Sequence, residues 1–148
     1  MKARPFVWGT FVWNMFDFTV NFRNEGGIKG RNDKGLVTYD RNTKKDAFFF
    51  YKANWSDEPT LYITSRRFVQ RISPTTDVKI YSNAKQVELM INGVSKGTIE
   101  SSGDGIFCWK GERLSVGENS IEARAKIGGR DLVDQCMWRL KPPTKKKE

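Results

Sequence analysis

Residues 120–127 read Ser-Ile-Glu-Ala-Arg-Ala-Lys-Ile, so small or apolar side chains alternate with polar or charged ones along the whole stretch. Successive side chains of a β-strand point to opposite faces of the sheet. The pattern therefore predicts a strand with one face in a core and one charged face in water. Phe107 and Trp109 are spaced in the same way and are expected to fill that core.

Six further strand-like segments lie on both sides of this stretch. Turn sequences rich in glycine and asparagine separate them, namely Asn92-Gly93, Gly103-Asp104-Gly105, Gly117-Glu118-Asn119 and Gly128-Gly129. Seven short strands at regular spacing are typical of an immunoglobulin-like antiparallel β-sandwich. The expected strands are residues 61–65, 78–82, 87–91, 95–99, 106–110, 120–127 and 132–140.

The first third of the chain has a different pattern. Residues 5–13 are apolar on both faces, which predicts a strand buried on both sides, as in a parallel sheet. Residues 17–42 are polar and glycine-rich and are expected to form a long loop. Asn42 or Thr43 can then cap a helix that continues to Asn54. Strand, loop and helix together predict one βα unit of a larger α/β assembly.

Composition excludes several kinds of chemistry. The 148 residues contain no His, which rules out Ser-His-Asp catalysis and His-bearing zinc sites. Cys108 and Cys136 stand 28 residues apart and lack metal-ligand or redox spacing; they either pair across the sandwich or are two small buried side chains. Part of the net charge of +9 comes from the lysines of residues 142–148. These residues are expected to form a basic disordered tail.

The stretch Gly9-Thr10-Phe11-Val12-Trp13-Asn14-Met15-Phe16-Asp17-Phe18 resembles the last barrel strand of the family 2 glycoside hydrolases, the β-galactosidase type. The resemblance continues through residues 23–27, 32–37 and 40–41 into the helix. The sandwich that follows is similar to the immunoglobulin-like module found after the barrel in these enzymes. The fold it implies is mainly β: a βα remnant of a TIM barrel in residues 1–56, then the sandwich in residues 57–141.

The same resemblance implies the role of one residue. Trp13 stands where these enzymes place a tryptophan on the wall of the sugar pocket, although Trp13 is alternatively a core residue. Retaining hydrolysis needs two carboxyl groups about 5–5.5 Å apart, and the family carries both glutamates on earlier barrel strands. We therefore expect no catalytic residue in this chain. Asp17 is expected to be a hydrogen-bonded structural carboxylate and Glu25 a loop residue.

No cofactor or metal site is expected. Lys34 occupies the position at which some family members have a metal-ligating Asn. The resemblance thus predicts a non-catalytic C-terminal portion of a glycoside hydrolase that supports the barrel and the pocket rim. The substrate of the parent enzyme is a carbohydrate, and the parent is expected to be a bacterial periplasmic or secreted protein.

Two other interpretations compete. A stand-alone carbohydrate-binding sandwich needs exposed aromatic rings, whereas Phe107, Trp109 and Trp138 occupy inward positions. A nucleic-acid binder interleaves aromatic and basic residues on one face, whereas here they fall on opposite faces. The apolar side chains of Phe6, Val7, Phe11 and Val12 and the helix face of residues 48–51 are expected either to fold onto the sandwich or to mediate self-association. No membrane-spanning segment is predicted, because residues 5–20 are apolar only in patches. A membrane is therefore not expected as a partner.

Overall fold

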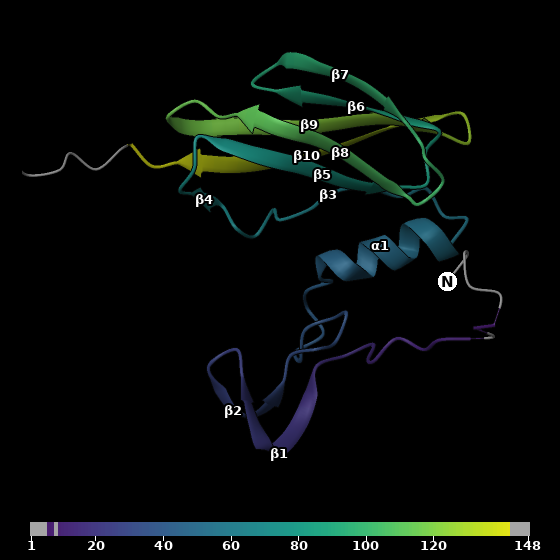
Figure 1. Ribbon diagram of the computed structural model, residues 1–148, viewed down its shortest axis with the longest axis vertical. Coiled ribbons are helices and arrows are strands. Elements are labelled where there is room, and N and C mark those ends of the chain that lie inside the picture. Colours follow the sequence, from purple (N-terminus) through teal and green to yellow (C-terminus); the bar gives the residue numbers. More distant parts are fainter. Residues whose placement is uncertain (1–5, 8, 143–148) are drawn as a thin grey trace, which may run out of the picture. The chain divides into compact units, whose positions relative to one another are not determined.

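The computed structural model describes residues 6–7 and 9–142 (Figure 1). Contacts divide the chain into two compact units, Met1–Phe48 and Phe49–Glu148. The basic tail expected at residues 142–148 lies outside the described residues apart from Pro142. Pro5 and Trp8 of the expected N-terminal strand also lie outside them.

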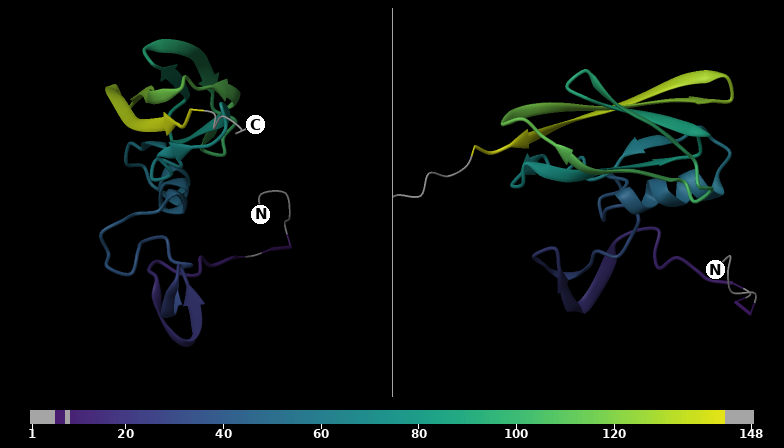
Figure 2. Two further views of the ribbon diagram at one scale, coloured as in Figure 1. Left: turned by 90° about the vertical axis from the view of Figure 1, so that its left-hand side faces the viewer. Right: turned by 45° about the horizontal axis from the view of Figure 1, so that its top comes forward.

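The second unit is a β-sandwich of two stacked sheets (Figures 1 and 2). One sheet has five strands in the order β4-β10-β9-β6-β7, and the other has three in the order β3-β5-β8. All seven expected strands are present, which confirms the fold class. These seven are β3 (Leu61–Ile63), β5 (Thr75–Ser82), β6 (Gln86–Ile91), β7 (Val94–Glu100), β8 (Ile106–Arg113), β9 (Gly117–Ile127) and β10 (Arg130–Leu140), and the short strand β4 (Gln70–Arg71) is an eighth that was not expected.

The core of the sandwich is filled from the inner faces of both sheets. Phe107 from β8 and Ile121 from β9 are fully buried, and Trp138 from β10 is almost so. The inward positions predicted for Phe107, Trp109 and Trp138 are therefore confirmed. Along β9, Ile121 and Ala123 are buried and Ala125 and Ile127 are half-buried, whereas Arg124 and Lys126 are exposed, so the alternation read from residues 120–127 is present in the strand.

Two hairpin turns form where the glycine signals predicted them. Asn92 and Gly93 have φ values of 53° and 76°, and Gly128 and Gly129 of 57° and 80°. Two consecutive left-handed residues suit the twist of a tight antiparallel hairpin. The turn predicted at 117–119 is wrong, because these residues already pair with β10. The buried Asn119 side chain instead closes the preceding loop, accepting from Ser115 N–H at 2.8 Å.

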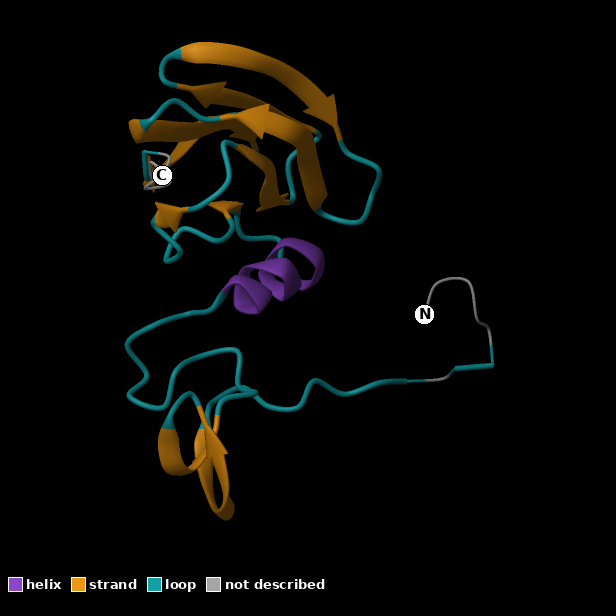
Figure 3. Cartoon of the chain, turned by 60° about the vertical axis from the view of Figure 1, so that its left-hand side comes forward, coloured by secondary structure: helices purple, strands orange, loops and turns teal. Residues whose placement is uncertain are grey.

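A helix, α1 (Asp46–Trp55), covers the outer face of the three-stranded sheet (Figure 3). The ring of Phe49 stacks on Tyr62 of β3 with centroids 3.6 Å apart, and Phe50 meets Tyr81 of β5 edge-on at 5.4 Å. The aromatic run of the helix, residues 48–51, is half-buried. A sheet face that would otherwise expose tyrosine rings is thereby covered.

The helix is confirmed but begins later than its predicted cap. Residues 38–43 form a closed turn instead of the first helical turn. Asp40 Oδ1 accepts from Asn42 N–H at 3.1 Å, and Thr38 Oγ1 accepts from Thr43 N–H at 3.0 Å. These side chains compete with helical hydrogen bonds, as Asp and Thr commonly do outside helices.

Two expectations for the first unit are wrong. The described residues of 5–13 form no strand, and Phe6 and Phe11 are 77% and 90% exposed. A strand of a parallel sheet needs neighbours on both edges, and none of the described strands pairs with this segment. The loop expected at 17–42 contains a hairpin, β1 (Phe18–Glu25) and β2 (Ile28–Asn32), drawn in purple in Figure 2. In β1, Phe18, Val20 and Phe22 alternate with the polar Thr19, Asn21 and Arg23, a strand pattern that the expectation of a loop overlooked.

Candidate functional site

The segment that carries Trp13 is fixed by a short parallel ladder. Residues 14–17 run beside residues 35–37 and share three backbone hydrogen bonds of 2.9 to 3.0 Å. Both strands of the ladder belong to the first unit. The bonds run from Leu36 N–H to Asn14 O, from Val37 N–H to Met15 O and from Asp17 N–H to Val37 O.

Asp17 lies at the end of this ladder and is completely buried. Its Oδ1 accepts from Lys45 Nζ at 2.6 Å and from Gly35 N–H at 2.8 Å. Arg31 Nη2 lies 3.8 Å from its other oxygen, Oδ2. A buried carboxylate needs such partners to offset the loss of water. Asp17 is therefore a hydrogen-bonded structural carboxylate, as its sequence context predicted.

The ladder also depends on the absence of a side chain at Gly35. A Cβ atom there would lie 2.1 Å from Asp17 N and 2.1 Å from Phe16 C. On the other side, the Arg41 guanidinium lies 4.0 Å from the centre of the Phe16 ring and donates to Asp17 O at 3.3 Å. Backbone contact, a buried ion pair and a cation–π contact thus hold the same short segment.

Trp13 immediately precedes this anchored segment. Its side chain is 70% exposed, and its ring meets Phe18 edge-on with centroids 6.2 Å apart. Trp13 is therefore not part of a core formed by the described residues of this chain. Phe11, at 90% exposure, and Phe22, at 85%, add further uncovered rings in the same unit. The first unit therefore presents aromatic surface that is available to a ligand or to another protein surface.

Glu25, like Asp17, is a carboxylate close to Trp13 in sequence that forms hydrogen bonds with a backbone amide and with a cationic side chain. Glu25 ends β1, where a loop was expected, and it accepts from Asp33 N–H at 2.9 Å and from Arg23 at 3.0 Å. Lys34 Nζ lies 3.7 Å from Glu25. The hydrogen bond from the Asp33 amide, helped by Arg23, lowers the pKa of Glu25 below its ordinary value. The acid of a retaining glycosidase needs the opposite shift.

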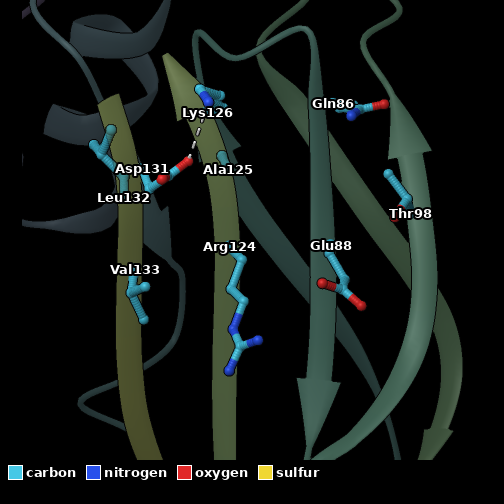
Figure 4. A pocket seen from close by; sticks show the side chains of 9 residues that line it. All are labelled: Gln86, Glu88, Thr98, Arg124, Ala125, Lys126, Asp131, Leu132 and Val133. Carbon is cyan, nitrogen blue, oxygen red and sulfur yellow. Dashed lines mark ion pairs between the residues drawn. The ribbon is translucent and has the colours of Figure 1, made fainter. Parts of the chain in front are cut away.

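The solvent face of the five-stranded sheet carries a shallow hollow between β6, β7, β9 and β10 (Figure 4). Lys126 pairs with Asp131 at 3.9 Å across it, and Arg124 pairs with Glu122 at 2.5 Å. Aromatic rings suited to stacking on sugars are absent from its lining, which is Gln86, Glu88, Thr98, Arg124, Ala125, Lys126, Asp131, Leu132 and Val133. The hollow therefore gives the stand-alone carbohydrate-binding interpretation no support.

Cys108 on β8 and Cys136 on β10 are both free thiols and half-buried, so they do not pair, and the alternative of two buried side chains is met only in part. Burial raises the pKa of Cys136 from 9.0 to about 11, outweighing the opposite effect of the nearby Arg66 cation. The thiol is an acid, so a raised pKa keeps it protonated to higher pH in the folded chain than in the unfolded chain.

We therefore expect alkylation of Cys136 to be slow at neutral pH. In a Cys108→Ser chain treated with iodoacetamide, the rate should rise about tenfold per pH unit and level off only near pH 11, because the thiolate is the nucleophile. The same chain unfolded in urea should level off near pH 9. A folded chain that already levels off at pH 9 would show that Cys136 is not buried as described.

Sequence reasoning identified Trp13 and Asp17 but not the cations around Asp17. Lys45, Arg31 and Arg41 are 28, 14 and 24 residues away from it, so no short motif connects them. The buried Asp17 could have indicated them, since a buried Asp requires a cation or several hydrogen-bond donors as partners.

Among the described residues, no group of three or more His, Cys, Asp and Glu could hold a metal ion. None of the described helices has the length and apolar character needed to cross a membrane.

The chain is similar to one family model and to glycoside hydrolases of known sequence. A family model described as a domain of unknown function, DUF4982, matches residues 74–133. A β-glucuronidase of Bacteroides fragilis is 47% identical over 136 residues, which are 91% of this chain and 19% of the relative. A β-galactosidase of Bacteroides ovatus is 22% identical over 139 residues, which are 91% of this chain and 16% of the relative.

The fold agrees with these likenesses. The crystal structure of an FMN-binding β-glucuronidase from Faecalibacterium prausnitzii L2-6 superimposes with a TM-score of 0.82 at 42% identity, covering 94% of this chain and 20% of that one. The chain spans about a fifth of the length of the relatives it matches. Over nearly its whole length the chain is therefore similar to one region of glycoside hydrolases, among them β-glucuronidases and a β-galactosidase.

Proposed function

We propose that this chain is a non-catalytic portion of a glycoside hydrolase that acts on β-glucuronides. The substrate class comes from the names of its relatives, of which a β-glucuronidase is 47% identical. One observation supports the role above the others: Trp13 is exposed while the residues that follow it are held rigidly. Such an arrangement suits a ring that must meet a ligand at a fixed angle.

In this proposal Trp13 forms part of the wall of the sugar pocket. The apolar face of a pyranose packs against an aromatic ring, which offers a large contact area at little cost in side-chain entropy. The acid and the nucleophile come from the remaining four-fifths of the protein length seen in the relatives. The carboxylates of Asp17 and Glu25 are committed to cations and amides and take no part in bond cleavage.

The rest of the chain then has a supporting role. We propose that residues 1–56 derive from the barrel, that residues 57–141 form the sandwich beside it, and that residues 142–148 are a basic tail. The exposed rings of Phe6, Phe11 and Phe22 would be covered by the neighbouring part of the barrel. Apolar patches of this kind drive association when left open, so the chain by itself should self-associate through them.

The proposal is tested in a chimera in which this chain replaces the matching fifth of the Bacteroides fragilis β-glucuronidase. The chimera should hydrolyse nitrophenyl β-glucuronide, whereas the chain alone should show no turnover. Trp13→Ala should lower kcat/KM of the chimera about 100-fold, since loss of a group that positions the sugar has effects of that order. Steady-state kinetics measure both quantities.

Trp55 offers a matched control, because its side chain is 66% exposed and lies on α1. Trp55→Ala should change kcat/KM by less than about threefold, and Trp13→Phe should keep part of the activity because a ring remains. The proposal is wrong if Trp13→Ala and Trp55→Ala behave alike. It is also wrong if a chimera that melts cooperatively has no activity on the glucuronide.

A further inference from the structure

The direction in which Trp13 projects is set by its neighbours in the chain. Its ring is 70% exposed, so packing around the ring itself fixes little. Residues 14–17, in contrast, are hydrogen-bonded along the ladder with residues 35–37. Whatever holds that ladder in register therefore also fixes the tryptophan.

A buried ion pair closes the ladder at one end. Asp17 has no exposed surface, and the Lys45 side chain, at 19% exposure, reaches it with an Nζ–Oδ1 distance of 2.6 Å. The same Nζ donates to Asp33 O at 2.7 Å, so one ammonium group connects Asp17, at the end of the Trp13 segment, with Asp33, two residues before the partner segment. A pair of this kind contributes little net stability compared with apolar side chains, but it defines geometry.

We propose that Asp17 and Lys45 are positioning residues: their buried ion pair holds residues 14–17 against residues 35–37 and thereby fixes the angle of Trp13 toward the sugar. The inference rests on the proposed role of Trp13. Neither residue touches the ligand. Both act through the backbone of the ladder, with Arg31 as a more distant cation 3.8 Å from Asp17 Oδ2.

The first test is made on the full chain and needs no activity. The chain is labelled with 5-fluorotryptophan, and the ¹⁹F resonance of Trp13 is assigned by its loss in Trp13→Phe. Asp17→Asn and Lys45→Met should each move this resonance toward its position in urea. The resonances of Trp109 and Trp138 should stay unchanged, because both rings lie in the sandwich core. Lys52→Met, which removes a cation that pairs with Glu58 at 2.8 Å, is the matched control. A Trp13 resonance that stays in place in both variants overturns the proposal.

The second test is a double-mutant cycle in the chimera. Asp17→Asn should lower kcat/KM about 100-fold when Trp13 is present, mainly through KM, and less than about threefold when Trp13 is already Ala. Lys45→Met should behave in the same way if Asp17→Asn prevents folding. Equal losses in both backgrounds would mean a general structural role and contradict the inference. If Trp13→Ala itself has no effect, the proposed function fails, while the ¹⁹F spectra still decide whether Asp17 positions the ring.

Discussion

Phe107→Ala is expected to lower the free energy of unfolding of the sandwich by about 4 kcal/mol, most of the stability of a small domain. Phe107 has no exposed surface and lies between the two sheets, where the core includes Ile80, Leu89 and Trp138. Removing the ring takes away its burial energy and leaves a cavity that the surrounding strands close only in part. Urea unfolding followed by tryptophan fluorescence measures the change, because Trp109 and Trp138 belong to the same core.

The matched control is Phe68→Ala, the same substitution at a ring that is 56% exposed. It should cost less than about 1 kcal/mol, because surface substitutions seldom change stability by more. A similar loss at Phe68 and Phe107 would contradict the division of the sandwich into a packed core and a solvated surface.

Gly35→Ala is expected to disrupt the ladder beside Trp13, with a local cost of about 3 kcal/mol. The new Cβ would lie 2.1 Å from the backbone of Phe16 and Asp17, and backbone cannot turn aside as a flexible side chain can. Hydrogen exchange of the amides of Asp17, Leu36 and Val37 should then be roughly 100-fold faster, since each 1.4 kcal/mol corresponds to a factor of ten.

Gly9→Ala is the control for this effect, because no atom lies within 4 Å of the position where its Cβ would be. It should leave the exchange of the same three amides unchanged. Protection of Leu36 and Val37 that survives Gly35→Ala would show that the two segments are not in the close contact described.

The sandwich could be predicted from sequence because its information is local. Strands β5, β6, β8, β9 and β10 each bury one face, so the alternation of their side chains is visible without knowledge of the partner strands. β4 was missed because Gln70 and Arg71 are only two residues, paired in parallel with the end of β10. Arg71 is nevertheless buried, with its guanidinium 3.6 Å from the centre of the Trp138 ring, and nothing in its sequence context indicated this.

The first unit was harder to predict because its structure depends on distant partners. Residues 5–13 have the composition of a buried strand, and composition cannot say whether neighbouring strands are present. The glycines and asparagines of the β1 and β2 hairpin predicted a loop, although Phe18, Val20 and Phe22 alternate with polar residues along β1. Asp17 was correctly assigned, whereas Lys45, which stabilises it, was not, because the contact joins residues 28 positions apart.

The resemblance to family 2 glycoside hydrolases added what local patterns could not supply. It connected the apolar N-terminal segment with the sandwich as parts of one architecture, and the relatives confirm that connection. It also drew attention to Trp13, whose exposure then proved compatible with a ligand-facing role. The role itself remains a proposal, as does the substrate class.

The central claim is that the chain supplies a pocket wall and a support, while the acid and the nucleophile lie elsewhere in the enzyme. The most direct measurement is hydrolysis of nitrophenyl β-glucuronide by the purified chain alone, set beside the chimera at equal concentration. We predict that the chain alone releases no nitrophenol above the buffer rate and that the chimera turns over repeatedly. Turnover that co-purifies with the isolated chain and disappears when the chain is unfolded would contradict the account.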